Sequence, residues 1–200
     1  MTILYLIYGN LYVNMTNRCP CACTFCLRQN DDELNGSGNL WLEREPTVEE
    51  VKAEFDKFPP DSYKDLVFCG YGEPTERLED LLEVAEFAKK KFGKKVRVNT
   101  NGLANLMYGK DVTPLFKGKV DEVSISLNTP DPQKYLELTR NKFGIASFEG
   151  MLKFAKDIKQ YVPNVTMTTV ETTITREEEE KCRKICEELG VNYRIRPFEN

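Results

Sequence analysis

Four cysteines lie within eight residues in the stretch Asn17-Arg18-Cys19-Pro20-Cys21-Ala22-Cys23-Thr24-Phe25-Cys26, which follows an apolar, strand-like run. Cys19, Cys23 and Cys26 are separated by three and then by two residues, so a single loop supplies three soft thiolates. This arrangement is a good match to an iron-sulfur cluster, and three thiolates leave one iron open to a small molecule. Cys21 lies in the same loop, so a closed site with four thiolate ligands is a second interpretation.

The spacing of the three cysteines, with the aromatic Phe25 before the last one, resembles the signature of radical S-adenosylmethionine (SAM) enzymes. Three later segments resemble further motifs of that superfamily, in the expected order: Gly70-Tyr71-Gly72-Glu73-Pro74, Asn99-Thr100-Asn101-Gly102 and Ser126-Leu127-Asn128. The first of these looks like a GGEP segment with an inserted tyrosine. Within the superfamily, the closest likeness is to the short TatD-associated radical SAM proteins, through Leu11-Tyr12-Val13-Asn14, residues 70–74 and Arg194-Ile195-Arg196-Pro197-Phe198.

The resemblance implies two cofactors, a 4Fe-4S cluster and SAM. Its metal ligands would be Cys19, Cys23 and Cys26, with Cys21 as a spectator. Phe25 would pack near the cluster or the adenine, and residues 70–74 would take the amino group of the methionine moiety. The other implied SAM contacts have side chains that can hydrogen-bond to ribose hydroxyls or to a carboxylate. Together the implied SAM-binding residues are Phe25, Gly70, Tyr71, Gly72, Glu73, Asn99, Thr100, Asn101, Ser126, Asn128 and Arg196.

The same resemblance implies an activity, the reductive cleavage of SAM to a 5′-deoxyadenosyl radical that abstracts hydrogen from a substrate. The electron would come from a reductant such as flavodoxin or ferredoxin, and the open side of a partial barrel leaves room for a large substrate. Two alternatives stay open at this point. One is an activase that makes a glycyl radical on a partner protein, and the other is a non-catalytic module that holds a four-thiolate metal or electron-transfer site.

Strand-like and helix-like segments alternate along the chain, which is typical of a parallel sheet with helical crossovers. The pattern predicts strands at 4–8, 11–14, 66–69, 96–99, 123–127, 165–172 and 193–196. It predicts helices at 48–58, 78–92, 132–140, 148–159 and 176–189. The first two strands flank Gly9-Asn10 and form a predicted hairpin. Six strand-helix units in 200 residues are too few for a closed barrel of about 250 residues, so we expect a partial (β/α)6 TIM-like barrel.

Composition fits one domain, residues 1–200, with 40% hydrophobic residues. The net charge of −4 carries no strong nucleic-acid signal, and no apolar run has the roughly 20 residues of a membrane-spanning helix. The absence of histidine excludes the common triads and histidine-zinc sites. Seven cysteines are an odd number, which favours reduced thiols and a soluble, cytoplasmic protein.

Three cysteines lie outside the cysteine-rich loop. Cys182 and Cys186 follow the spacing of a buried helix stripe together with Ile185 and Leu189, so we interpret both as small core residues. Cys69 ends a predicted strand beside the proposed SAM segment. It is either a buried strand residue or a residue that faces the cavity, and the first interpretation is favoured.

Overall fold

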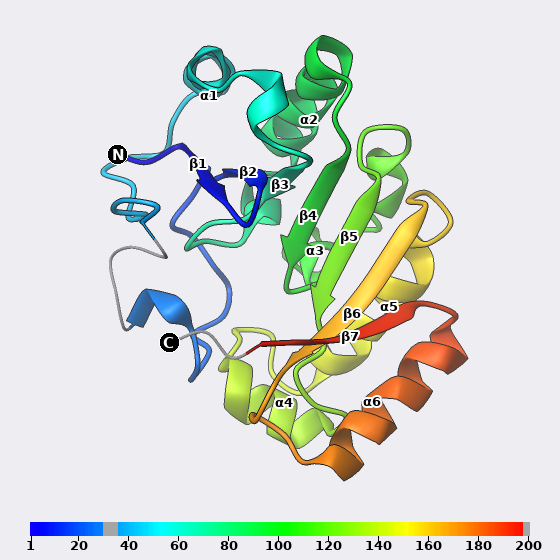
Figure 1. The fold of residues 1–200 in the computed structure, drawn as a ribbon. Coiled ribbons are helices and arrows are strands. Elements are labelled where there is room, and N and C mark those ends of the chain that lie inside the picture. The colour runs from blue at the N-terminus through cyan, green and yellow to red at the C-terminus, as the bar shows by residue number, and fades with distance from the viewer. Residues whose placement is uncertain (30–35, 198–200) are drawn as a thin grey trace.

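The computed structural model describes residues 1–29 and 36–197, so Phe198 of the last motif lies outside the described residues. Seven strands form one sheet in the order of the sequence, as Figure 1 shows. They are β1 (Leu4–Ile7), β2 (Asn10–Val13), β3 (Leu66–Phe68), β4 (Val96–Thr100), β5 (Glu122–Ser126), β6 (Asn164–Val170) and β7 (Asn192–Arg196). β1 pairs antiparallel with β2, and β2 to β7 pair in parallel. β1 and β7 are edge strands, so this open sheet confirms the predicted partial (β/α)6 barrel with an N-terminal hairpin.

The hairpin turn lies one residue earlier than the sequence predicted. Tyr8 and Gly9 occupy the turn with φ values of 50° and 71°, which are typical of a two-residue turn of type I′. Asn10 instead pairs with Ile7 as the first residue of β2. Its side chain donates to the Tyr8 carbonyl at 3.2 Å and accepts from the Asp65 amide at 3.2 Å, which links the hairpin to the start of β3.

The helices of the described chain are α1 (Val48–Glu54), α2 (Leu78–Phe92), α3 (Ala104–Tyr108), α4 (Pro132–Thr139), α5 (Ala146–Ile158) and α6 (Arg176–Leu189). Five of them match predicted helices. The first is shorter than expected, because it continues after Glu54 as a 3₁₀ turn at Phe55–Lys57. The sequence analysis missed α3, a five-residue helix whose N-cap residue, Leu103, makes no side-chain capping bond.

The two faces of the sheet differ in what covers them. On β4, Val96, Val98 and Thr100 are buried against the helices, whereas Arg97 and Asn99 are half-buried on the opposite face. Figure 1 is seen from this second face, with α3 and α5 behind the strands. We call it the inner face of the partial barrel. On β4 this alternation directs the apolar side chains outward toward the helices and leaves polar side chains inside, whereas β3 buries all three of its apolar residues.

The cysteines of α6 are core residues, as predicted. Cys182 and Cys186 are 0% and 1% exposed in the main hydrophobic core. Burial raises the pKa of each thiol to about 12, so both are protonated at neutral pH.

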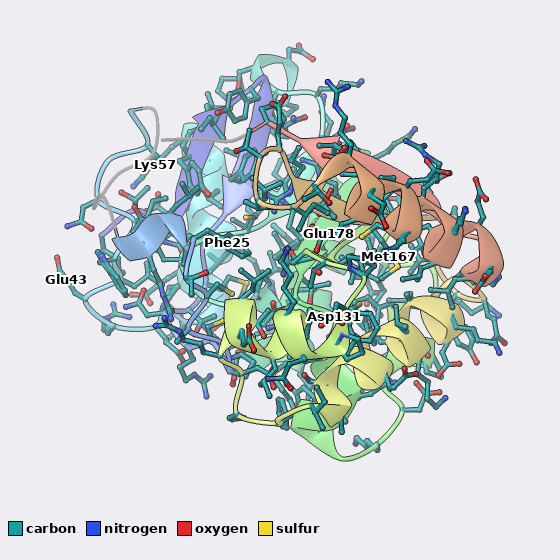
Figure 2. The ribbon with its side chains drawn as sticks, turned by 90° about the horizontal axis from the view of Figure 1, so that it is seen from below. Phe25, Glu43, Lys57, Asp131, Met167 and Glu178 are labelled. Atoms are coloured by element: carbon teal, nitrogen blue, oxygen red, sulfur yellow. The ribbon has the colours of Figure 1, made fainter. Side chains whose placement is uncertain are left out.

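The cysteines and the three later SAM-like motifs lie at or just after the carboxyl ends of strands, and parallel pairing brings those ends to one edge of the sheet. Figure 2 looks onto the molecule from this side, with Phe25 drawn between the turn at Leu27–Gln29 and the middle of the molecule. No helix among the described residues is long and apolar enough to cross a membrane.

Replacement of Thr175 by alanine should destabilise the protein by about 1 kcal/mol, because it removes the N-cap of α6. The Thr175 hydroxyl accepts from the Glu178 amide at 3.2 Å, and the Glu178 carboxylate accepts from the Thr175 amide at 2.8 Å. Urea unfolding of Thr175→Ala measures the loss. Glu187→Ala, an exposed change in the same helix, is the control, and equal stability of the two variants would contradict the prediction.

Candidate functional site

The cysteine-rich loop is held against the carboxyl end of α4. The amides of Ala22 and Thr24 donate to the carbonyls of Thr139 and Leu138, each at 2.9 Å. The last carbonyls of a helix have no partner within the helix, so the loop satisfies them. The Lys142 amide, beyond the helix, donates to the Pro20 carbonyl at 3.1 Å. Backbone contacts on both sides thus fix the loop that carries the predicted ligands.

Within this loop the four thiols differ in burial and in protonation. Cys21 is 4% exposed, whereas Cys19, Cys23 and Cys26 are half-buried. Hydrogen bonds from Cys21 lower the pKa of the Cys19 and Cys23 thiols, and the same bonds together with burial raise the pKa of Cys21. Burial raises the pKa of Cys26. These hydrogen bonds thus favour the protonated form of Cys21 and the ionised forms of Cys19 and Cys23.

The described residues contain no group of three Cys, Asp or Glu side chains that converges on a single metal ion. A 4Fe-4S cluster binds each of its thiolate ligands at a different iron, so the ligands surround a volume and need not meet at one point. The donor set fits that cluster, since it consists of three half-buried thiols on a loop fixed at both sides. Arg28 adds a cation beside the loop, with its guanidinium donating to the Cys21 carbonyl at 3.0 Å.

A buried carboxylate, that of Glu73, connects the loops that carry the motifs. Its Oε1 accepts from the Thr75 hydroxyl and the Thr100 hydroxyl, each at 2.6 Å, and its Oε2 accepts from the Asn101 amide at 2.8 Å. The Glu73 amide donates to the Arg18 carbonyl at 2.8 Å. Burial raises the pKa of this carboxyl, and the bonds it accepts oppose that shift. Glu73 and Thr100, both predicted SAM contacts, are therefore also bonded to each other.

Glycine is required at two positions of the segment 70–74, because the cysteine-rich loop and β2 approach it closely. A Cβ on Gly72 would lie 2.2 Å from the Thr16 carbonyl oxygen and 2.7 Å from that of Arg18. A Cβ on Gly70 would lie 2.1 Å from the side-chain oxygen of Asn14. No side chain fits into either contact. The two glycines therefore let the segment lie directly against the strand end that leads to the cysteines.

Asn99 and Asn101 reach two different cysteines. The Asn101 side-chain amide donates to the Cys21 sulfur at 3.7 Å, so the segment after β4 contacts the cysteine-rich loop directly. Asn99 forms a hydrogen bond with the Cys69 thiol. Cys69 is half-buried and is absent from the hydrophobic core, so the favoured prediction of a buried strand residue was wrong. Its neighbour Asn99 places it on the inner face.

Several buried polar atoms near these loops have no hydrogen-bond partner among the described residues. They include the side-chain oxygen of Asn128, which is 3% exposed and has a φ of 66°, and the hydroxyl of Tyr135, which is 0% exposed. The Tyr135 hydroxyl lies on α4, within electrostatic range of Cys19, Cys21 and Cys23. Buried polar atoms are normally paired. Unpartnered ones around the cysteine-rich loop are consistent with a bound group that supplies the missing partners.

The remaining predicted contacts lie around this centre. Tyr71 is 7% exposed and packs edge-on against Trp41 with ring centroids 5.3 Å apart. Ser126 and Arg196 are half-buried at the ends of β5 and β7, and Phe25 is half-buried beside the cysteines. The sequence analysis missed Thr75, Arg28 and Tyr135. Thr75 follows Glu73 closely enough to suggest a local bond, but Tyr135 gave no signal beyond an apolar helix position.

Replacement of Gly72 by alanine should push the segment 70–74 away from the cysteine-rich loop and destabilise the protein. Backbone atoms of residues 16 and 18 occupy the space that the new Cβ would need. Gly109→Ala is the control, because a Cβ at residue 109 would meet no described atom within 4 Å. Its only expected effect is the backbone strain of a non-glycine residue at a φ of 63°, which costs about 1 kcal/mol of stability. Thermal unfolding should show a clearly larger loss for Gly72→Ala. Equal losses would contradict the close approach.

Replacement of Tyr135 by phenylalanine should leave the cluster-free protein at least as stable as the unmodified chain. The hydroxyl has no hydrogen-bond partner among the described residues, so its removal breaks no bond. Removal also relieves the cost of burying an unpaired polar group, about 1–3 kcal/mol, which stabilises the folded state. Tyr108→Phe is the matched control, because the Tyr108 hydroxyl donates to the Thr75 carbonyl at 3.1 Å and accepts from the Leu78 amide at 3.2 Å. Tyr108→Phe should be destabilised in urea, and an equal loss for Tyr135→Phe would contradict the assignment of its hydroxyl as unpartnered.

Solved structures share this fold at low sequence identity. The protein SuiB of Streptococcus suis, solved bound to S-adenosylmethionine, superposes with a TM-score of 0.67 at 17% identity, over 94% of this chain and 40% of that one. Methylornithine synthase superposes with a TM-score of 0.66 at 17% identity, over 94% of this chain and 52% of that one. Identities this low establish the fold alone.

Curated relatives share sequence as well. A GTP 3′,8-cyclase of Corynebacterium glutamicum is 30% identical over 141 residues, which are 66% of this chain and 34% of that protein. The tungsten-containing aldehyde ferredoxin oxidoreductase cofactor-modifying protein of Pyrococcus furiosus is 26% identical over 84% of this chain and 44% of its own. The chain thus spans between a third and half of the length of these relatives. The Radical SAM superfamily model matches residues 13–189, almost the whole described chain. The chain belongs to the radical SAM superfamily, whose enzymes use a 4Fe-4S cluster and SAM.

Proposed function

We propose that this chain cleaves SAM reductively to methionine and a 5′-deoxyadenosyl radical, which abstracts a hydrogen atom from a substrate. One observation carries the proposal: the buried Glu73 carboxylate and its amide join the segments 70–74 and 99–102 to the cysteine-rich loop. The predicted ligands and the predicted SAM contacts are thereby held at one edge of the sheet. The superfamily match supports the same assignment.

The ligands in this proposal are Cys19, Cys23 and Cys26, and they leave one iron for the amine and carboxylate of the methionine moiety. When bound, the reduced cluster supplies one electron to the sulfonium of SAM. The chain itself positions the reactants. The buried Cys21 thiol lies within hydrogen-bond range of both Cys19 and Cys23, and its one S–H can stabilise the thiolate form of either neighbour. Its own thiol is not required as a ligand.

The remaining contacts in the proposal belong to SAM. Gly70 and Gly72 present bare backbone to the amino group, and Glu73 fixes the conformation of that segment. The Ser126 hydroxyl and the unpartnered side-chain oxygen of Asn128 form hydrogen bonds with the ribose hydroxyls. Aromatic side chains of the region, among them Phe25 and Tyr71, exclude water from the reacting centre. A flavodoxin or ferredoxin is the proposed source of the electron.

Replacement of Cys23 by alanine should abolish both cluster binding and SAM cleavage, whereas Cys21→Ala should retain both. The measurement is 5′-deoxyadenosine formed from SAM by the anaerobically reconstituted, dithionite-reduced protein, together with its iron content and electron paramagnetic resonance spectrum. Cys182→Ala, a change in the core of α6, controls for loss of folding.

Two outcomes would count against this proposal. Loss of the cluster in Cys21→Ala would favour a closed site with four thiolates and no open iron. A fully loaded protein that forms no 5′-deoxyadenosine would contradict cleavage by this chain alone. If cleavage then appeared on addition of a copurifying partner protein, an activase would replace the proposed function.

A further inference from the structure

The inner face of the partial barrel is polar and carries cationic side chains. Sheet register places Arg97 of β4 beside Val67 of β3, and Arg196 of β7 beside Val170 of β6. Side chains two residues apart share a face of a strand, so Arg194 and Arg196 lie on the same side of β7. β4 and β7 are separated by two strands, β5 and β6, in the open sheet.

The guanidinium of Arg97 has N–H donors that are not used in hydrogen bonds within the described part of the chain. Its side chain is half-buried, and Nη2 donates a long hydrogen bond to the Tyr12 hydroxyl at 3.4 Å. The buried Nε has no hydrogen-bond partner, and no described carboxylate pairs with the side chain, although Glu122 lies beside it on β5. A guanidinium presents five N–H donors in a fixed fork that matches a carboxylate or phosphate. A partly buried guanidinium whose Nε has no described acceptor is suited to binding an oxyanion.

Cys69 lies within electrostatic range of both arginines. Burial is the largest effect on its thiol and raises the pKa, the guanidinium groups of Arg196 and Arg97 lower the pKa, and the buried Glu73 carboxylate has a smaller, raising effect. Asn99 adds a hydrogen bond to the same sulfur. Two cations from different strands therefore lie within electrostatic range of one thiol, directly before the segment 70–74. The site includes Asn99 and Arg196, which the sequence analysis assigned to SAM, and it is distinct from the cysteine-rich loop.

Aromatic side chains bound this site on the side of the hairpin. Tyr5 and Tyr12 stack with ring centroids 5.2 Å apart, and they belong to a second apolar cluster with Tyr71 and Trp41. The Tyr5 hydroxyl donates to the Cys69 carbonyl at 3.1 Å, which fixes this aromatic wall to the end of β3. An apolar wall lowers the local dielectric constant, so an ionic contact made beside it is stronger than one in open water.

We propose that Arg97 and Arg196 bind an anionic group of the substrate, a phosphate or a carboxylate, on the inner face beside Cys69. The proposal rests on the function proposed above, because a substrate held there lies next to SAM. It narrows the substrate class to molecules that carry an oxyanion. The residues concerned bind and orient the substrate, and no proton or electron passes through them.

The test compares two alkylating reagents at one thiol. Iodoacetate is an anion and iodoacetamide is neutral, and both react with the thiolate form of Cys69. The ratio of the iodoacetate rate to the iodoacetamide rate therefore reports the local electrostatic potential at Cys69. A change in the pKa of Cys69 alters both rates equally and leaves the ratio unchanged. Peptide mapping by mass spectrometry measures this ratio in the folded, full-length protein and in urea. We expect a higher ratio in the folded protein. In Arg97→Gln it should fall at least about threefold, the effect of one unit charge at several ångströms in a high-dielectric medium.

Lys184→Gln is the matched control, because it removes the same charge from an exposed position on α6. The ratio in that variant should stay unchanged. Inorganic pyrophosphate and malonate then compete for the site, and the anion that protects Cys69 at the lower concentration distinguishes a phosphate from a carboxylate. Protection should be lost in Arg97→Gln.

Four outcomes would overturn the proposal. These are a Cys69 that reacts with neither reagent, a ratio insensitive to Arg97→Gln, protection by neither anion, and loss of the iodoacetate preference when SAM saturates the protein. The last outcome would assign the arginines to the carboxylate of SAM. Formation of 5′-deoxyadenosine is measured separately on the unmodified chain and on Arg97→Gln. Failure of the proposed function would abolish that product without changing the alkylation ratios, so the two failures are distinguishable.

Discussion

The hydrogen bonds around the Glu73 carboxylate are the interaction on which the site depends. Its two oxygens accept from Thr75, Thr100 and Asn101, and its amide donates to the Arg18 carbonyl. A buried carboxylate costs much free energy unless its oxygens are paired, and here the partners belong to separate loops. Satisfying one charge therefore fixes the relative positions of the loops after β2, β3 and β4. The close approach at Gly72, which leaves no room for a Cβ, depends on the same arrangement.

Two different surfaces meet at this edge of the sheet. On one side, the cysteine-rich loop is bonded to the end of α4, and the protonated Cys21 lies among the predicted ligands. On the other side, the inner face offers arginines, an amide and an aromatic wall. The parallel topology explains why both are present, because every strand delivers its following loop to the same end. The hydrophobic core lies between the sheet and the helices and leaves the inner face to polar groups.

The order of strands, the N-terminal hairpin and five of the helices could be predicted from hydrophobic periodicity, capping boxes and turn residues. Capping boxes at Thr47 and Thr175 begin α1 and α6 in the structure. The errors arose where tertiary contacts decide local structure. The hairpin turn moved to Tyr8 and Gly9 because the side chain of Asn10 bonds to the start of β3. Helix α3 carries no capping bond of its own and packs against α5, so no local signal marked it.

Sequence alone determined the superfamily, the cysteine spacing and the order of the motifs, because ligand type and spacing are local properties of a chain. The narrower likeness to TatD-associated proteins stays a prediction. Only the tertiary structure decided which polar groups meet. It paired Glu73 with Thr100, and it brought Tyr135 within electrostatic range of the cysteine-rich loop and both Arg97 and Arg196 within electrostatic range of Cys69. These residues are far apart in sequence, and the curvature and register of the sheet alone determine their distances in space.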